Sequence, residues 1–425
     1  MEFKKITVGN FAENLDRFRI PLSSAEREKK RGKYPYYGAA KIIDYVDGFT
    51  HSGLSVLIVE DGSVETDKGY PVVQLANGEY WVNNHTHVLK GKNDWDTLYL
   101  YYALQIIKVS PFVTGAVQKK ISQKALNSME LNYFEDPMIR RKIVESLLGL
   151  DKKIELNTQI NQTLEQIAQT IFKSWFIDFD PVHAKANALA NGQTLEQATQ
   201  AAMAVISGKN TQELHRLQTA NPEQYQQLWE IAEAFPSGVD EEGVPMGWES
   251  KKVGEVAKIV KGKKPKLISS EPDDGFLPHI LMVSLSGKYT EYAQIDKSIV
   301  CDIFDTLILM DGAASGKIAI GHKGVIGSTF AKMELSENKY WALFNQFMFS
   351  KEQDIQANTT GTSIPHTDKA RVLDYEIIVP CDVVLNYFTE MYKNILCSIL
   401  NQRKNSFLLE NVRDLLLPKL LSGEV

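Results

Sequence analysis

The feature that most constrains this chain is an internal repeat with a period of about 245 to 250 residues. The corresponding segments are 3–9 with 248–254, 54–62 with 304–312, and 114–126 with 360–372. Both copies of the second segment, LSVLIVEDG and FDTLILMDG, are apolar strand-like runs closed by an Asp-Gly turn signal. Side-chain identity between the halves is low, but several features keep their order at one offset. We therefore expect two modules that share a fold and display different surfaces.

The third segment aligns Gly115 with Gly361, Lys119 with Pro365 and Leu126 with Val372. In each half a strand-like stretch follows, and then a long helical pattern. The predicted fold class is therefore α+β, with two mixed α/β modules in a pseudo-twofold arrangement, joined by two long antiparallel coiled-coil helices. The expected divisions are module 1 at 1–137, a first helix at 138–180, a helical insertion at 181–245, module 2 at 246–380 and a second helix at 381–425.

Both helical segments repeat apolar residues at alternating spacings of four and three, which is typical of a coiled-coil seam. The central seam positions are Ile154, Asn157, Asn161 and Leu164 in the first helix, and Ile395, Ile399, Gln402 and Ser406 in the second. Each seam has its polar pair near the middle, so an antiparallel pair would place these polar groups face to face and fix the register. A helix of about 38 residues is roughly 57 Å long, which exceeds one DNA turn of about 34 Å. The alternative is two unrelated core helices.

The insertion carries two helix-start signals. Thr194 with Gln197 forms a capping-box pattern, and Asn221 followed by Pro222 is a favourable helix start. We expect two or more helices there, and the sequence assigns them no function.

Composition narrows the class of protein. With 44% hydrophobic and 24% charged residues, the chain has the composition of a soluble globular protein. No apolar run reaches the roughly 18 residues of a membrane span, and the charged N-terminus does not look like a signal peptide. The chain has three cysteines and no CxxC pair, which suits a reducing cytoplasm; they are Cys301, Cys381 and Cys397. We expect a cytoplasmic protein without a metal site.

The net charge of −6 argues against a uniformly cationic surface, so local basic patches matter more. Residues 258–266, KIVKGKKPK, contain five lysines and no acid, and residues 27–41 are also strongly basic and include tyrosines. Such runs fit either a nucleic-acid contact or a solvated face.

Catalytic motifs are weak. The segment GAASGK at 312–317 resembles a phosphate-binding loop, but it is one residue short and Ile318 stands where Ser or Thr would hold magnesium. A nuclease-like set of Asp273, Glu337 and Lys339 occurs only in the second half. His85 and His87 alternate along a predicted strand, so they are expected to share a face, in a structural or DNA-facing role rather than a zinc site. The glycine-rich cofactor loop and the Asn/Asp-Pro-Pro-aromatic loop of an adenine methyltransferase do not occur in the sequence.

Almost the whole chain resembles the specificity subunits of type I restriction–modification systems. The segments that carry the resemblance are GKYPYYGAAKIIDYVDGF at 32–49, YWVNNHTHVLKG at 80–91, IAQTIFKSWFIDFDPV at 167–182, VPMGWE at 244–249, GTSIPHTDKARVLDYEIIVP at 361–380 and RDLLLPKLLSGEV at 413–425. Their joint order is specific. Lys119 departs from the proline that many members have, as Pro365 is here, and the insertion is longer than the family core requires.

The resemblance implies two target-recognition domains, each reading one half of an asymmetric bipartite site in double-stranded DNA. The two helices would pack antiparallel, set the length of the unread spacer and dock two modification subunits. It also implies that this chain binds no cofactor and has no catalytic activity. S-adenosylmethionine would be held by the modification subunits, and ATP and Mg by restriction subunits that complete the complex.

Candidate DNA contacts follow from the basic segments and the glycine loops, since lysines neutralise phosphates and side chains in the grooves read bases. They are Lys33, Tyr36, Lys119, Lys120 and Lys124 in module 1, and Lys261, Lys263, Lys264, Lys266, Thr362, Ser363, His366, Lys369 and Arg371 in module 2. Each could instead be solvated surface, and Tyr36 a packed strand residue. Phe172, Trp175 and Phe176 fit either the core or a docking patch for a modification subunit.

Two other functions remain open at this point. One is a self-sufficient restriction endonuclease or methyltransferase, and the other is a scaffold that does not bind DNA.

Overall fold

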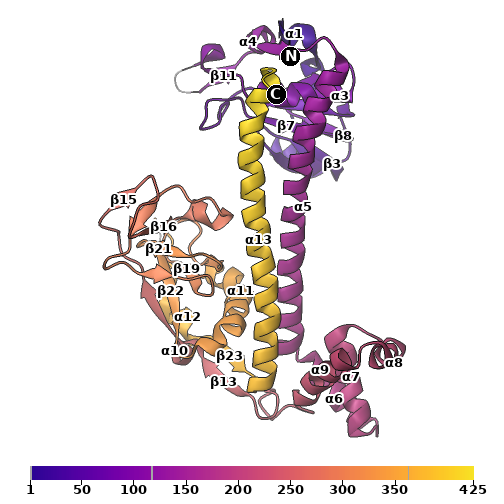
Figure 1. The fold of residues 1–425 in the computed structure, drawn as a ribbon, viewed down its shortest axis with the longest axis vertical. Helices are drawn as coiled ribbons and strands as arrows, with labels where there is room; N and C mark the ends of the chain where they lie inside the picture. The colour runs from indigo at the N-terminus through magenta and orange to yellow at the C-terminus, as the bar shows by residue number, and fades with distance from the viewer. Residues whose placement is uncertain (1, 116–117, 362) are drawn as a thin grey trace. The chain divides into compact units, whose positions relative to one another are not determined.

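The computed structural model describes residues 2–115, 118–361 and 363–425. The chain divides into two compact units, Met1–Glu155 with Leu408–Val425, and Leu156–Phe407. These are called unit 1 and unit 2, and each contains one module together with part of both long helices (Figure 1). Each unit is described by itself.

Module 1, in unit 1, is built mainly from short strands. Its strands are β1 (Lys4–Thr7), β2 (Glu13–Asn14), β3 (Arg31–Tyr37), β4 (Ile42–Val46), β5 (His51–Ser52), β6 (Ser55–Val59), β7 (Val73–Ala76), β8 (Glu79–Val82), β9 (Thr86–Lys90), β10 (Val113–Thr114), β11 (Lys120–Ile121) and β12 (Glu130–Tyr133). Its helices are α1 (Val8–Phe11), α2 (Ser24–Lys29), α3 (Asp94–Leu104) and α4 (Gln123–Ser128), with 3₁₀ turns η1 (Asp16–Phe18) and η2 (Ser110–Phe112).

Two four-stranded sheets organise module 1, in the orders β2-β9-β6-β7 and β4-β3-β8-β5. Strand β6 is the apolar run SVLIV and is buried at every residue, because it lies between two neighbours in the sheet and packs against α3. Strands β3 and β8 pair in parallel, while β1 pairs antiparallel with β12. Val56, Ile58, Tyr99 and Phe134 belong to the core of this unit.

Module 2, in unit 2, has a closely similar series of elements. Its strands are β13 (Glu249–Lys252), β14 (Ala257–Lys261), β15 (Ile268–Ser269), β16 (Phe276–Ile280), β17 (Tyr292–Gln294), β18 (Val300–Cys301), β19 (Thr306–Leu309), β20 (Ile318–Ala319), β21 (Gly324–Ile326), β22 (Phe330–Leu335) and β23 (Glu376–Val379). Its helices are α10 (Val253–Val256), α11 (Trp341–Ala357) and α12 (Lys369–Asp374), with 3₁₀ turns η3 (Met282–Ser286) and η4 (Asn338–Tyr340).

The sheets of the two modules have the same topology. The order β14-β22-β19-β20 repeats β2-β9-β6-β7, and β17-β16-β21-β18 repeats β4-β3-β8-β5, with β15 added at the edge beside β17. The parallel pair β16–β21 repeats β3–β8, and the antiparallel pair β13–β23 repeats β1–β12. The predicted duplication of a mixed α/β module is therefore confirmed.

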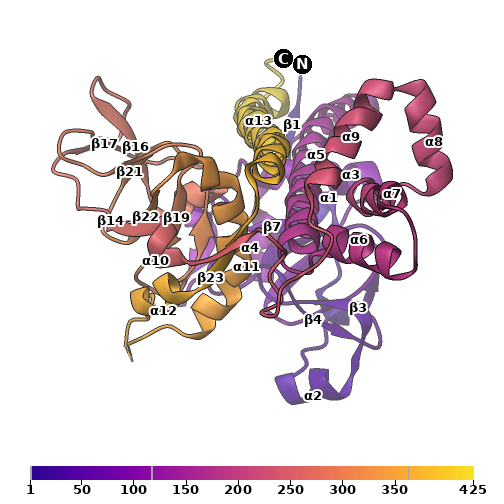
Figure 2. The same ribbon diagram turned by 90° about the horizontal axis from the view of Figure 1, so that it is seen from below.

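Two helices of 40 residues each, α5 (Pro137–Phe176) and α13 (Asp382–Leu421), contribute to both units. Within unit 2, Asn157 contacts Ser406 and Phe172 packs near Phe388, so the two segments run in opposite directions. Within unit 1, Arg413 donates a hydrogen bond to Asp151 at 2.8 Å. Figures 1 and 2 show the two helices side by side. The predicted antiparallel helix pair is confirmed.

Four helices occupy the insertion, α6 (Asp180–Ala190), α7 (Leu195–Ser207), α8 (Thr211–Ala220) and α9 (Pro222–Ala234). The capping box of Thr194 and Gln197 forms as the sequence predicts, and Asn221 caps α9. Lys185 on α6 is buried and donates to the backbone oxygens of Ala232, Glu233 and Phe235, which satisfies carbonyls at the end of α9. Of the helices in the described ranges, none has the length and apolar character to cross a membrane.

The aromatic residues near the end of α5 lie in the core of unit 2. Phe172, Trp175 and Phe176 are each at most 5% exposed. Trp175 meets Phe235 edge to face with ring centres 5.3 Å apart, and Phe176 meets Phe388 at 5.0 Å. Between the two interpretations left open by the sequence, the structure supports the core.

Candidate nucleic-acid interface

A glycine loop joins β10 to β11 in module 1. Gly115 has φ of +88°, and a Cβ placed there would lie 2.1 Å from the carbonyl oxygen of Gln118, so a larger residue would distort the loop. The Thr114 hydroxyl donates to the backbone oxygen of Lys120 across its ends. Ser122 then caps α4 by accepting from the backbone N–H of Ala125.

Module 2 repeats this loop. Gly361 has φ of +90°, and a Cβ there would lie 2.5 Å from the carbonyl oxygen of Ile364. Thr360 and His366 exchange two backbone hydrogen bonds of 2.8 and 2.7 Å. Asp368 caps the following helix α12. The two loops therefore have the same construction although few of their side chains agree.

The Asp-Gly turn after the buried strand holds the glycine loop in each module. The Gly62 N–H donates to the backbone oxygen of Lys119 at 2.9 Å, and the Gly312 N–H donates to that of Pro365 at 3.0 Å. Only a carbonyl is needed at this position, and Pro supplies one as well as Lys does. The departure at Lys119 therefore leaves the loop anchored in the same way.

The predicted contacts of module 1 divide into surface and core. Lys33, Lys119, Lys120 and Lys124 are exposed. Lys119 is paired with Glu65, and Lys120 with Glu60 at 2.9 Å. Tyr36 is only 1% exposed and its hydroxyl accepts from the backbone N–H of Leu22, so the prediction that it touches DNA is wrong. It lies on β3, a central strand whose second half enters the core.

The predicted contacts of module 2 lie on the surface. Exposed residues are Lys261, Lys263, Lys264, Lys266, Ser363, His366, Lys369 and Arg371, while Thr362 lies outside the described residues. Lys261 and His366 come together on Asp311, at 2.9 and 2.8 Å. Arg371 binds Asp354 at 2.9 Å and is also within hydrogen-bond distance of the Tyr375 hydroxyl. Partial burial opposes ionisation of Asp311, but hydrogen bonds from Lys261 and His366 outweigh it and lower the pKa of this carboxyl.

A buried charge network in module 1 was not foreseen from the sequence. Arg19 donates to Glu60 at 2.6 Å and lies 3.4 Å from Asp16, while Asp16 also faces His87 Nδ1 at 2.5 Å. His87 Nε2 lies 2.8 Å from the backbone oxygen of Ile121. Burial opposes ionisation of both acids, but a hydrogen bond from His87 lowers the pKa of Asp16, and hydrogen bonds from Arg19 and Lys120 lower the pKa of Glu60.

The oxygen and nitrogen atoms of Asp16, Glu60 and His87 lie within 4.8 Å of one another, a spacing that a metal ion could use. Arg19 and Lys120 already form ion pairs with the carboxylates of Asp16 and Glu60, so we interpret these residues as an ion-pair network. His87 is buried and His85 is 48% exposed, because β9 begins after His85. The expectation that the two histidines share a face is therefore wrong.

Residues in and beside the two weak catalytic motifs make contacts within the fold. In the GAASGK segment, the Ser315 hydroxyl donates to the backbone oxygen of Met310, and the Ile318 N–H donates to Glu352. Lys339 of the nuclease-like set binds Asp382 at 3.0 Å and Glu337 at 3.4 Å.

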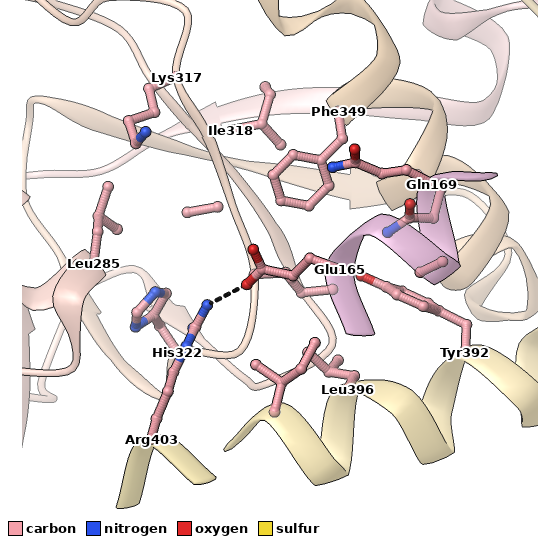
Figure 3. A pocket seen from close by; sticks show the side chains of 15 residues that line it. Glu165, Gln169, Leu285, Lys317, Ile318, His322, Phe349, Tyr392, Leu396 and Arg403 are labelled. Atoms are coloured by element: carbon pink, nitrogen blue, oxygen red, sulfur yellow. Dashed lines mark hydrogen bonds and ion pairs between the residues drawn. The ribbon is translucent and has the colours of Figure 1, made fainter. Parts of the chain in front are cut away.

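A cavity of about 220 Å³ lies within unit 2 between module 2 and the helix segments (Figure 3). Glu165 of α5 and Arg403 of α13 form an ion pair of 3.1 Å at its wall. Burial, with a contribution from Arg403, lowers the pKa of His322 to about 4, so this ring is neutral at pH 7. None of the residues that line the cavity is among the predicted DNA contacts.

The seam between the helices contains a polar contact. Asn157 is fully buried and its amide donates to the Ser406 hydroxyl at 3.2 Å. The Oδ1 atoms of Asn157 and Asn161 are buried without a hydrogen-bond partner in the described part of the chain. Around them, Ile399 is buried and the remaining seam positions, Ile154, Leu164, Ile395 and Gln402, are partly buried.

Comparison with known proteins gives consistent results. Residues 1–166 and 245–382 match the family described as the type I restriction modification DNA specificity domain. The chain is 33% identical over 338 residues to the type I restriction enzyme HindI specificity subunit of Haemophilus influenzae, which covers 72% of this chain and 71% of that protein. It is 24% identical over 396 residues to the MjaIX specificity subunit of Methanocaldococcus jannaschii, covering 87% of this chain and 79% of that one.

A solved structure has the same fold. The S subunit of a type I restriction-modification system from M. genitalium has a TM-score of 0.56 and 15% sequence identity, and the match covers 99% of this chain and 96% of that chain.

Proposed function

Since this chain belongs to the family of type I restriction–modification DNA specificity subunits, we propose that each of its modules reads one half of a bipartite, asymmetric DNA site. The observation that carries the proposal is the duplication itself. The same two sheets and the same anchored glycine loop occur twice, and different side chains surround them. A fold that is repeated with different surface side chains fits a protein that recognises two different half-sites.

In this proposal the exposed lysines of each module bind phosphates, which supplies affinity, while the loops supply sequence choice. Module 1 would use Lys33, Lys119, Lys120 and Lys124. Module 2 would use the lysines between β14 and β15, the glycine loop, and the cations on α12.

We further propose that α5 and α13 set the unread spacer and dock two modification subunits. Support for docking comes from large apolar side chains that α13 leaves exposed. Leu408 is 50% exposed, Val412 44% and Leu415 68%, and all three belong to unit 1. Exposed apolar side chains close together on a helix favour a protein partner over water.

Chemistry would then belong to other chains of the complex. The modification subunits would bind S-adenosylmethionine and methylate adenine, and the restriction subunits would use ATP and Mg. The specificity subunit would work in the cytoplasm, where the DNA is.

Methylation mapping tests the proposal. The chain is expressed with its modification subunits in a host that lacks other adenine methylation, and the methylated sites are mapped. We expect one asymmetric bipartite sequence, and no methylation from the chain alone with S-adenosylmethionine. Methylation by the isolated chain would support a self-sufficient enzyme, and a complex that neither binds nor methylates a defined sequence would support a scaffold.

A further inference from the structure

The acid of the Asp-Gly turn occupies an equivalent place in the two modules. Asp61 precedes Gly62 after β6, and Asp311 precedes Gly312 after β19. The backbone of each acid forms an isolated antiparallel bridge with the glycine loop, Asp61 with Lys120 and Asp311 with His366. Each acid is thus fixed at the base of the loop that carries predicted DNA contacts.

Each of these acids also holds an imidazole. His85 Nδ1 lies 2.9 and 3.0 Å from the two carboxylate oxygens of Asp61, and His366 Nδ1 lies 2.8 Å from Asp311. A carboxylate only accepts, so Nδ1 carries a hydrogen in both rings and Nε2 is the remaining hydrogen-bonding atom of each ring. The side chains of His85 and His366 are 48% and 49% exposed.

The two histidines reach this common position by different routes. His85 comes from the turn between β8 and β9, whereas His366 belongs to the glycine loop. The residue of module 1 that matches His366 in the loop is Lys120, which binds Glu60. In module 2, Met310 stands in the place of Glu60, and Lys261 binds Asp311 instead. Alignment of the repeats therefore does not reveal the pair of histidines.

Two different segments, one in each module, place a histidine on the equivalent acid. This indicates that an imidazole is needed at this position. A merely structural pair would not need the ring exposed on the loop side of the module, and a surface ion pair adds little stability. We propose, on the basis of the proposed function, that His85 and His366 contact the DNA half-site of their own module and that Asp61 and Asp311 are positioning residues that orient them. With a hydrogen on Nδ1, a neutral ring accepts at Nε2 from a base amino group, whereas an imidazolium donates from Nε2 to a phosphate oxygen.

A double-mutant cycle in module 1 provides the test, because Asp61 holds His85 and, among the described residues, no lysine forms an ion pair with its carboxylate. The chain is assembled with its modification subunits, and binding is measured to the bipartite duplex found by methylation mapping. His85→Ala and Asp61→Asn are each expected to weaken binding about fivefold or more. The double variant should bind no worse than His85→Ala alone, since Asp61 acts through the ring.

Module 2 is tested by His366→Ala alone, because Asp311→Asn would also release Lys261. Controls are His215→Ala on α8 and Asp302→Asn, an exposed acid near Lys323. Thermal unfolding midpoints confirm that each variant folds. Duplexes with one half-word scrambled identify the DNA atom: a penalty that disappears when that module's half-word is scrambled marks a base contact, and one that persists marks a phosphate contact.

Full additivity of the two substitutions, or unchanged binding by His85→Ala and His366→Ala, would overturn the inference. If the proposed function is wrong, the result is different: the complex with the unsubstituted chain would bind the intact and the scrambled duplexes equally.

Discussion

The side-chain amide of Asn157 donates a hydrogen bond of 3.2 Å to the hydroxyl of Ser406, joining the middles of α5 and α13 within unit 2. Asn157 is fully buried, and its Oδ1 has no hydrogen-bond partner in the described ranges. One satisfied donor and one unsatisfied acceptor in an apolar seam favour a defined pairing at some cost in stability.

Replacing Asn157 with Leu should therefore raise the unfolding free energy of the helix pair by about 1 kcal/mol, because an apolar side chain of similar size removes the unsatisfied oxygen. Thermal unfolding followed by far-UV circular dichroism measures the change. Asn394→Leu, at an exposed position of α13, is the control and should leave the midpoint nearly unchanged. A lower midpoint for Asn157→Leu would show that the bond to Ser406 outweighs the cost of burial.

The charge network of module 1 makes a prediction about acid. Burial disfavours the ionised form of Glu60, but Arg19 and Lys120 hold its pKa below the ordinary value of 4.5. A carboxyl whose folded pKa is lowered stabilises the fold above its unfolded pKa, and this contribution is lost as pH falls through the folded value. The stability of module 1 should therefore decrease progressively below about pH 4.5.

Glu60→Gln removes one of the two carboxylates beside Arg19, which keeps Asp16 at 3.4 Å, so we expect a loss of about 2 kcal/mol at neutral pH. Its stability should also depend less on pH in the acid range than that of the unsubstituted protein. Hydrogen exchange of β6 and β9, corrected for the intrinsic exchange rate at each pH, reports both effects. Glu79→Gln, an exposed residue of β8, should change neither. Equal acid sensitivity of Glu60→Gln and the unsubstituted protein would contradict the role of this carboxylate.

Much of the architecture can be predicted from the sequence because it depends on local patterns. The repeat, the seams of α5 and α13, and the capping box at Thr194 are visible as spacing and residue type, and each recurs in the structure. Gly115 and Gly361 could also be identified, since a glycine retained at the same place in two divergent copies indicates a backbone conformation that other residues avoid.

The rest depends on contacts between distant segments. Tyr36 looks like a surface residue within a basic stretch, but its burial follows from the parallel pairing of β3 with β8, which no local pattern encodes. His87 meets Asp16 across 71 positions of the chain. The alternation of His85 and His87 predicted a shared face only as long as both lie on one strand, and β9 begins between them.

Gly361 in the second glycine loop allows a test of whether the shape of this loop, rather than backbone strain in general, matters for DNA binding. Gly361→Ala places a Cβ 2.5 Å from the carbonyl oxygen of Ile364 at φ of +90°, so the loop must rearrange. Binding of the assembled complex to its bipartite duplex should weaken about tenfold or more, which corresponds to about 1.4 kcal/mol. Gly275→Ala is the matched control, because Gly275 has φ of +76° with no atom within 4 Å of the added Cβ. Equal binding by both variants would mean that the shape of this loop does not matter for DNA.

The last prediction concerns the helices as a ruler. Seven residues inserted into both α5 and α13 keep the spacing of the seam, so the pairing of the helices is preserved. Seven residues lengthen a helix by about 10 Å, which is about three base pairs of rise at 3.4 Å each. If the helices set the spacing of the two half-words, methylation mapping of the lengthened protein should return both half-words intact with an unread gap longer by about three base pairs. Insertion in one helix alone is the control, and it should abolish methylation because the seams no longer match. An unchanged gap in the doubly lengthened protein would mean that the modules take their spacing from another part of the complex.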